Sequence, residues 1–363
     1  MTLQVTLVAG INPSVTRSGG IRTYVLGLCR YLASTGTDVT LLGIGSSPES
    51  QPFKFIAATS ESQTTSLVFQ HSLRKFLRDH DFSDAIIHAQ RPDDLVPFLA
   101  NENDIRSVVT IHGDPLPGIR SRHGRIASLI YRKLERKGVC AAERLLFVDP
   151  QSREVFSRRY PAVASRFMDT AVGIDLNVFR PSDPERARRD WDLNRRPYVL
   201  FAGRFESEKN LGFLARAISL CETRPTLLLA GGKSGDAALR QVFDGVAHRF
   251  LGIVSHDRMN SLFSAVDATV LPSMREAMPT VCLESLACGV PVVATPVGRI
   301  PELIKSGTNG FVVEGGPSAF AQAIDLAIHS SGSMRQTCRE SVRRFGWDTV
   351  GPALVQVYRE VIP

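Results

Sequence analysis

The sequence has no long apolar run and no paired cysteine motif. None of its apolar stretches reaches the ~18 residues that a membrane-spanning helix needs. The chain enters a strand-like segment at residues 3–9 without a basic leader, so we expect no signal peptide. Its six cysteines form no C-x-x-C pair and show no zinc-ligand spacing. Scattered cysteines among apolar neighbours are typical of reduced core residues, which predicts a cytoplasmic protein.

A metal-binding motif is also lacking. The D-x-D pattern occurs twice, at Asp79-His80-Asp81 and at Asp190-Trp191-Asp192. Both copies lie in helical or linker sequence, and neither follows a strand. We interpret them as chance matches and predict neither a metal ion nor a required cofactor.

What is present is typical of a large α/β protein. Hydrophobic residues make up 43% and charged residues 22% of the 363 residues, as in ordinary globular proteins, and the length favours two domains. Strand and helix signals alternate, which predicts parallel sheets with crossover helices. We expect strands at 3–9, 38–44, 53–58, 84–88, 106–111 and 143–148, and again at 198–202, 226–230, 248–251, 268–271, 291–294 and 310–313. Helical patterns include 20–35, 64–79 and 123–138, and the proline- and arginine-rich segment 179–197 is expected to be a linker.

Two glutamates are the most informative residues. Glu276 lies in a loop after the apolar run 268–271, and Glu284 lies about one turn inside a helix that begins at Thr280 or Val281. The free N–H groups of that helix start can bind an anionic phosphate. Carboxylates on either side of an anion site suit a ligand with hydroxyls on both sides of a diphosphate, which describes a sugar nucleotide.

The stretch 272–295 around these glutamates resembles the E-x7-E region of family 4 glycosyltransferases, and the resemblance continues through 295–304 and 307–313. Members of that family are retaining enzymes of the GT-B fold. The resemblance implies two Rossmann-like, doubly wound domains that face a deep interdomain cleft. We expect an N-terminal acceptor-side domain at 1–178 and a donor-side domain at 179–346. The amphipathic segment 347–363 is expected to form a helix that crosses back to the N-terminal domain.

Two cations follow the first predicted strand of the second half. Arg204 comes directly after that strand, and Lys209 is expected to open the next helix. Ligands of open α/β sheets bind at the carboxyl ends of strands, and fixed cations there would stabilise a departing diphosphate. The segment resembles the family's G-R-x(n)-K-G diphosphate clamp, although Asn210 replaces the usual glycine.

Two further sites are expected in the first half. Gly19 and Gly20 follow the first strand and resemble the family's glycine-rich loop, which closes over the donor phosphate. His112 ends the apolar run 108–111 and resembles the histidine that faces the donor sugar in the family. A plain turn and a histidine bonded to a loop carbonyl are the ordinary alternatives.

The resemblance also implies which residues bind each part of the donor. Glu284 is expected to bind the ribose hydroxyls, and Glu276 the transferred sugar, aided by the backbone of Ala277, Met278, Pro279 and Thr280. The diphosphate is expected at Arg204, Lys209, Gly20 and the helix start at Thr280 and Val281. The nucleobase is expected near Ile253, in the segment 249–254, and a UDP-sugar is favoured over a GDP-sugar because UDP donors are common in the family.

The net charge of +7 is densest along residues 120–137, where seven arginines and lysines interleave with Ile126, Leu129, Ile130 and Leu134. Two interpretations remain open. The segment is either a peripheral membrane face at the inner leaflet or an ordinary helix that buries its apolar stripe. No nucleic-acid-binding motif accompanies these charges.

The predicted function is hexosyl transfer to a glycan, a lipid-linked acceptor or a small molecule. Catalytic roles are expected for Glu276, His112, Arg204 and Lys209. The alternatives are a nucleotide-sugar epimerase-like or phosphorolytic enzyme on the same fold, and a catalytically silent scaffold that binds a sugar nucleotide. The oligomeric state is not predicted.

Overall fold

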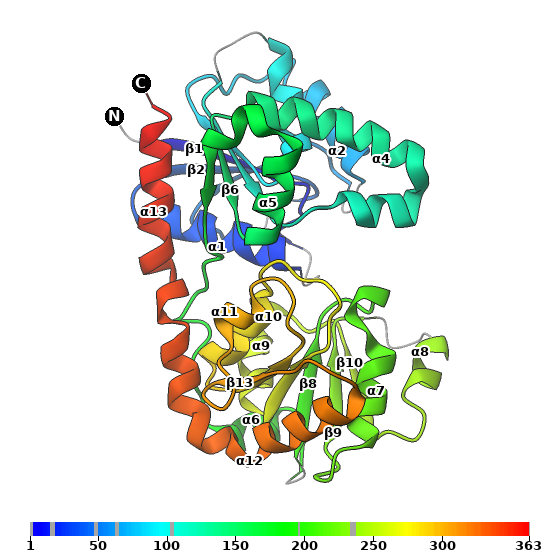
Figure 1. Ribbon diagram of the computed structural model, residues 1–363. Coiled ribbons are helices and arrows are strands. Elements are labelled where there is room, and N and C mark those ends of the chain that lie inside the picture. The colour runs from blue at the N-terminus through cyan, green and yellow to red at the C-terminus, as the bar shows by residue number, and fades with distance from the viewer. Residues whose placement is uncertain are drawn as a thin grey trace. The chain divides into compact units, whose positions relative to one another are not determined.

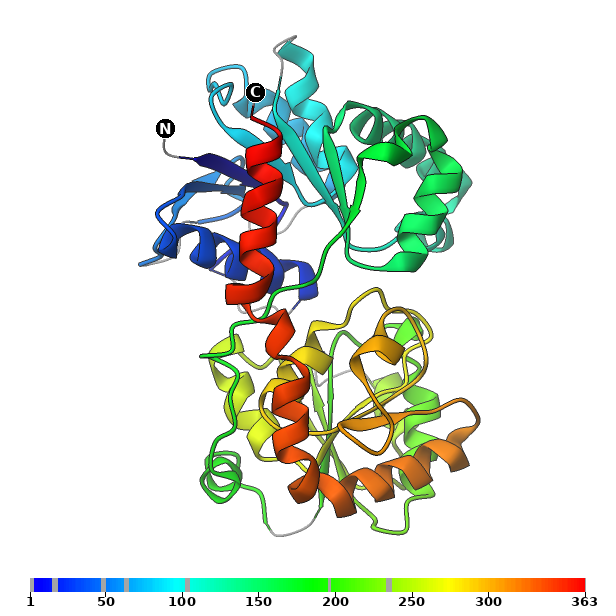
Figure 2. The same ribbon diagram turned by 60° about the vertical axis from the view of Figure 1, so that its left-hand side comes forward.

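The computed structural model describes residues 3–14, 19–46, 50–61, 65–101, 105–194, 197–232 and 237–362. Two compact units are present (Figures 1 and 2). The first contains the N-terminal strand, residues 21–173 and the C-terminal segment from Trp347. The second contains residues 174–346 together with Gly19 and Gly20. None of the helices in the described ranges combines the length and the hydropathy of a membrane span.

The first unit is built on a seven-stranded sheet in which every pair is parallel. The strand order is β3-β2-β1-β4-β5-β6-β7, so the order reverses between β1 and β4. Its strands are β1 (Gln4–Val8), β2 (Asp38–Gly43), β3 (Lys54–Ala57), β4 (Ile86–Ala89), β5 (Ser107–Ile111), β6 (Arg144–Phe147) and β7 (Phe167–Asp169). Its helices are α1 (Gly20–Ser34), α2 (Ser66–Phe76), α3 (Pro92–Leu95), η1 (Val96–Asn101), α4 (Leu116–Ala141), α5 (Pro150–Arg159), η2 (Pro161–Arg166) and α13 (Trp347–Glu360).

The second unit repeats this plan with six parallel strands in the order β10-β9-β8-β11-β12-β13. Its strands are β8 (Tyr198–Ala202), β9 (Thr226–Ala230), β10 (His248–Gly252), β11 (Ala268–Leu271), β12 (Val292–Ala294) and β13 (Gly310–Val312). Its helices are α6 (Pro184–Asp190), η3 (Ser207–Lys209), α7 (Leu211–Ser219), α8 (Ala237–Val242), α9 (His256–Ser264), α10 (Thr280–Ala287), α11 (Ile300–Leu303), α12 (Pro317–Ser341) and η4 (Arg343–Phe345). The prediction of two doubly wound parallel sheets is confirmed.

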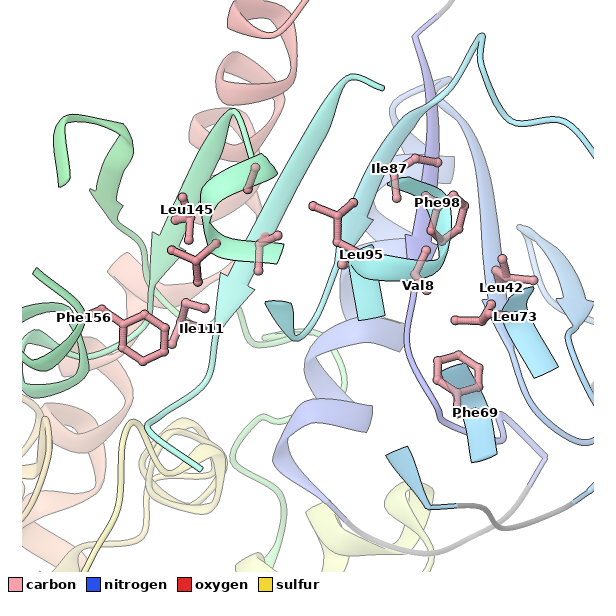
Figure 3. Packing of buried hydrophobic residues seen from close by; sticks show 14 of the residues in the cluster. Val8, Leu42, Phe69, Leu73, Ile87, Leu95, Phe98, Ile111, Leu145 and Phe156 are labelled. Carbon is pink, nitrogen blue, oxygen red and sulfur yellow. The ribbon is translucent and has the colours of Figure 1, made fainter. Parts of the chain in front are cut away.

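The strands are almost wholly apolar because helices cover both faces of each sheet. In the first unit, Val8, Ile87 and Val109 from adjacent strands lie in one cluster with Phe69 of α2 and Phe156 of α5, and all five are at most 1% exposed (Figure 3). Burial of this kind, at roughly 25 cal/mol per Å² of apolar surface, is the main stabilising term of such a core.

The prediction of a linker at 179–197 is wrong for the described residues, 179–194 and 197. Pro184, which suggests an interruption, stands in the first turn of α6, where proline is favourable, and Asp183 caps that helix. Arg188 donates to Asp267 Oδ1 at 2.8 Å, and Trp191 is only 8% exposed. The segment is therefore a packed part of the second unit. The short strand β7 was not predicted from the sequence.

Close contacts fix the C-terminal helix α13 within the first unit. Trp347 lies against Gly27 of α1 and against Gly173, and its ring packs near Tyr24 and Tyr31. Further along α13, the Tyr358 hydroxyl lies 2.6 Å from His88 Nδ1, and His88 Nε2 lies 2.7 Å from the Thr110 hydroxyl. A buried polar chain thus ties α13 to β4 and β5.

We expect Gly27→Ala to destabilise this arrangement. A Cβ atom on Gly27 would lie 2.6 Å from Trp347 Nε1, so the indole would have to shift. Overpacking of this kind costs about 1–3 kcal/mol. Thermal unfolding should move to lower temperature, and hydrogen exchange should accelerate in α13. Gly212→Ala in α7 is the control, because no atom lies within 4 Å of its Cβ position. Equal behaviour of the two variants would contradict the packing argument.

Candidate functional site

The strand order of the second unit reverses between β8 and β11. Loops that leave two such strands run in opposite directions, and the space at their carboxyl ends is where open α/β sheets bind ligands. Arg204 and Lys209 follow β8, whereas Glu276 follows β11. The residues predicted from sequence therefore lie at this reversal point.

An ion pair joins the two loops. Lys209 Nζ donates to Glu276 Oε1 at 2.5 Å, and the Ser273 hydroxyl donates to the same oxygen at 2.7 Å. The two charged side chains are 18% and 12% exposed. Both contacts use Oε1, and Oε2 accepts no hydrogen bond from a described residue. The pair therefore fixes the carboxylate and leaves one oxygen for a bound molecule.

Lys209 does not open a helix as expected. It ends the short η3 turn, and Asn210 separates it from α7. Asn210 has φ 54° and ψ 45°, a left-handed conformation that glycine and asparagine adopt most readily. Asparagine can therefore replace the family's usual glycine here.

Arg204 lies apart from this ion pair. Its side chain is 65% exposed, and it donates to Glu206 Oε1 at 2.6 Å. The guanidinium is thus accessible, and its exposed pairing with Glu206 is weak enough to exchange for a bound anion.

The start of α10 has no side-chain cap. Pro279 occupies the capping position, and the first N–H groups, at Thr280 and Val281, have no acceptor within the helix. Unsatisfied N–H groups and the helix dipole together favour an anion at this point. The carboxylate of Glu276 and the helix start therefore flank a place suited to a diphosphate.

A residue that the sequence reasoning missed shapes this loop. Gly298 has φ +55°, and a Cβ atom on it would lie 2.2 Å from Glu276 O and 2.4 Å from Ala277 O. The next residue, Arg299, donates its N–H to Ala277 O at 2.9 Å. Only glycine allows this approach, so Gly298 positions the loop that carries Glu276. Its signal was the stretch 295–304, where the family resemblance continues.

Glu284 is a buried carboxylate. It is 7% exposed, and no described residue donates a hydrogen bond to its side chain. Burial raises the pKa of Glu284 to about 7. An unpaired buried carboxylate is unfavourable, and donors supplied by a bound molecule would favour its ionised form.

His112 lies at the carboxyl end of β5 in the first unit. Its Nε2 lies 2.9 Å from Gln90 Oε1, and the ring meets Tyr24 edge-on with centroids 5.1 Å apart. Burial lowers the pKa of His112 to about 4, so the imidazole is neutral near pH 7. If Nε2 donates to Gln90, Nδ1 is left as an acceptor for a hydroxyl. Gln90, which follows β4, gave no signal in the sequence beyond its place after a strand.

The remaining predicted residues lie at the start of α1, after β10 and in the loop before α10. Gly19 and Gly20 are exposed and stand at the start of α1, and Ser18 lies outside the described residues. Ile253 follows the edge strand β10 and is 46% exposed, whereas Met278 is buried beside Glu276. Within the described ranges, no cluster of three or more histidine, cysteine, aspartate or glutamate side chains could hold a metal.

Comparison with known protein families gives two matches. Residues 18–177 match the family described as Glycosyltransferase Family 4, and residues 196–330 match the one described as Glycosyl transferases group 1. A protein named D-inositol 3-phosphate glycosyltransferase from Xylanimonas cellulosilytica is 29% identical over 246 residues. That alignment spans 62% of this chain and 59% of the relative, so the chain matches less than two thirds of that protein's length.

Two solved structures share the fold over nearly the whole chain. Sucrose-phosphate synthase from Thermosynechococcus elongatus superposes with a TM-score of 0.82 at 21% identity and covers 99% of both chains. Anabaena Alr3699/HepE in complex with UDP and glucose gives a TM-score of 0.77 at 19% identity, over 98% of this chain and 99% of the other. These similarities confirm the GT-B fold.

The Glu284 pKa leads to a pH prediction. Because the folded pKa is raised, the contribution of this group to stability is complete below the unfolded pKa near 4.5 and is lost as the pH rises through about 7. Glu284→Gln does not titrate. The free energy of unfolding of the wild type should fall relative to this variant by about 2–3 kcal/mol between pH 5 and pH 8.

Chemical denaturation at these two pH values, without ligand, measures that difference. Glu314→Gln is a matched control, since Glu314 is exposed in the same unit. Parallel pH profiles for the wild type and Glu284→Gln would show that Glu284 is not the buried, unpaired group described here.

Proposed function

Since the chain belongs to the family 4 glycosyltransferases, we propose that it is a retaining hexosyltransferase that uses a nucleotide-diphosphate sugar. The observation that carries the proposal is the meeting of Lys209 and Glu276 where the strand order of the second unit reverses. Such a site needs a cation for the leaving diphosphate and a carboxylate for the sugar. Lys209 and Glu276 supply these two groups side by side.

We propose that separate groups bind the diphosphate and the ribose of the donor. Arg204, Lys209 and the uncapped start of α10 bind the diphosphate, with the glycines Gly19 and Gly20 contributing from the start of α1. Glu284 accepts hydrogen bonds from the ribose hydroxyls. This role is supported by its burial without a hydrogen-bond donor from the part of the chain that the structure describes, because hydroxyl donors would satisfy the carboxylate.

The transferred sugar is assigned to two other groups. The free Oε2 of Glu276 accepts from a sugar hydroxyl, with the backbone of 277–280 alongside it. The neutral His112 accepts from a second hydroxyl through Nδ1. Ile253 is assigned to the nucleobase, since it is exposed at the end of β10.

The proposed reaction needs no separate protein base. The bond between the anomeric carbon and the β-phosphate oxygen breaks, and the acceptor oxygen bonds to that carbon on the same face. The acceptor proton passes to the leaving phosphate oxygen. Arg204, Lys209 and the α10 dipole stabilise the negative charge that develops on the diphosphate, which is the largest electrostatic demand of the step.

A UDP-sugar is the favoured donor. The support is the similarity to Alr3699/HepE, which was solved with UDP and glucose. The acceptor is proposed to be a hydroxyl of a glycan, a lipid-linked sugar or a small polyol. The Xylanimonas relative is named for an inositol phosphate, which supports a small polyol acceptor.

We also propose that the enzyme works in the cytoplasm and requires no metal ion. The six cysteines are all unpaired, and five of them are buried, which suits a reducing compartment. Cations and a helix start take the place that a metal occupies in other transferases.

Nucleotide binding tests the diphosphate clamp. UDP, GDP, ADP and their glucose conjugates should be compared by thermal unfolding. A ligand at a hundredfold excess over its dissociation constant stabilises the native state by about 2.7 kcal/mol. We expect UDP and UDP-glucose to raise the unfolding temperature, and Arg204→Ala and Lys209→Met to reduce that shift.

Arg216→Ala is the control, since Arg216 is an exposed cation of α7 in the same unit. A shift that survives in both clamp variants would disprove the clamp. The lack of a shift with every nucleotide would contradict the proposed donor site as a whole, and with it both the transferase and a scaffold that binds a sugar nucleotide.

The stereochemistry of transfer is checked without knowledge of the acceptor. Slow hydrolysis of UDP-glucose by a retaining enzyme should release α-glucose first, because water replaces the acceptor on the same face. Proton NMR in the first minutes, before mutarotation, reports the anomer. Release of β-glucose would contradict the retaining mechanism.

A further inference from the structure

Helix α4 of the first unit has an unusual charge distribution. It runs from Leu116 to Ala141, breaks its helical geometry at Gly124, and lies beside α5 (Figure 1). Its 26 residues include seven arginines and lysines and a single acid, Glu135. Because Glu135 is fully buried, no acidic side chain of α4 reaches its outer face.

Packing fixes which face of α4 points inward. Glu135 accepts from Arg159 at 2.8 Å and from the Tyr160 hydroxyl at 2.7 Å. One turn later, Gly138 lies so close to α3 that a Cβ atom would come within 1.8 Å of Pro92 O. Tyr131 and Val139 share this buried face. Rotation of the helix about its axis would break all of these contacts, so its outer face is set.

That outer face is apolar at its centre. Ile126, Leu129 and Ile130 are 77%, 65% and 48% exposed, and their spacing of three and four residues places them together. The interpretation of 120–137 as a helix that buries its apolar stripe is therefore wrong for these three residues, whereas Leu134, the fourth member of that stripe, is half-buried. The sequence contains a second helical stripe, formed by Tyr131, Glu135 and Val139, and it is this one that packs inward.

Cations surround the apolar centre. Arg125, Arg132, Lys133, Arg136 and Lys137 are exposed, and none forms an ion pair with a described residue. A hollow of about 510 Å³ adjoins the apolar centre, where α4 meets the segment after α5. Leu129, Arg132, Lys133 and Arg136 line its α4 side, and residues 159–163 line the other.

We propose that this face of α4 docks on an anionic lipid bilayer. Ile126, Leu129 and Ile130 enter the boundary between headgroups and acyl chains, and the surrounding cations meet the lipid phosphates, one of which fits the basic hollow. Apolar residues framed by unpaired cations are the pattern of an interfacial helix. A second copy of the chain would bring the same positive charge to the contact. The docking surface does not depend on the proposed donor site.

Vesicle binding by the whole chain tests this surface. Cosedimentation should be strong with vesicles that contain phosphatidylglycerol, weak with pure phosphatidylcholine, and reduced by salt. The variant Ile126→Ser/Leu129→Ser/Ile130→Ser should lower binding at least ~10-fold, because three apolar side chains no longer leave water. Arg132→Gln/Lys133→Gln/Arg136→Gln should lower it by about fivefold for each cation removed.

The double variant Leu220→Ser/Leu326→Ser is the matched control, since both leucines are 54% exposed in the second unit. A second readout uses Ile130→Trp, whose emission should shift to the blue with anionic vesicles only. The native tryptophans, Trp191 and Trp347, are 8% exposed and give a steady background.

Lack of binding to anionic vesicles would overturn the proposal, and so would equal binding by the wild type and the triple serine variant. Self-association that the serine variant abolishes, without vesicle binding, would assign the face to a second copy instead. Thermal shifts with UDP are measured separately, so a failure here leaves the donor site untouched.

Discussion

The reversal of strand order at the centre of each sheet is the constraint on which the rest of the molecule depends. A parallel strand can be joined to its neighbour only by a right-handed crossover, so a chain that starts in the middle and builds outward in both directions covers both faces with helices. At the starting strand the loops must separate. In the second unit that separation places Lys209 and Glu276, 67 positions apart in the chain, within one ion pair. The topology of the sheet therefore determines which two loops meet at the site, whatever side chains these loops carry.

The same site shows that the protein tolerates unfavourable electrostatics where a ligand is expected. Glu284 lies buried with no donor among the described residues, and α10 begins without a side-chain cap. Each feature would be corrected by a single polar neighbour, as Asp149 does for α5 with its hydrogen bond to the Ser152 N–H. Their combination within five residues of one helix supports the donor site proposed above. Gly298 packs directly against the backbone of the loop that carries Glu276, which is possible because it has no side chain.

Most of the fold could be predicted from the sequence, because both sheets are built from apolar runs that are stable only when buried as strands. The strand ends then indicated where Arg204, His112 and Glu276 lie. Three features could not be read. The segment 179–197 has the composition of a linker, yet Asp183 and Pro184 form a good helix start. Helix α4 carries an apolar stripe and a mixed stripe that includes Glu135, and contacts from α3 and α5 bury the mixed one. The lack of a partner for Glu284 depends on what surrounds it in space, which spacing along the chain does not reveal.

The placement of α13 has a consequence for how the protein is made. The second unit is inserted into the first, since the chain leaves the first unit after Gly173 and returns at Trp347. During synthesis the sheet of the first unit can form early, but Gly27, Tyr31 and His88 lack their contacts with α13 until that helix leaves the ribosome. The second unit, whose strands all lie between residues 174 and 346, can fold as soon as this segment has emerged. The sheet of the first unit therefore emerges before the second unit, but its packing is completed after it.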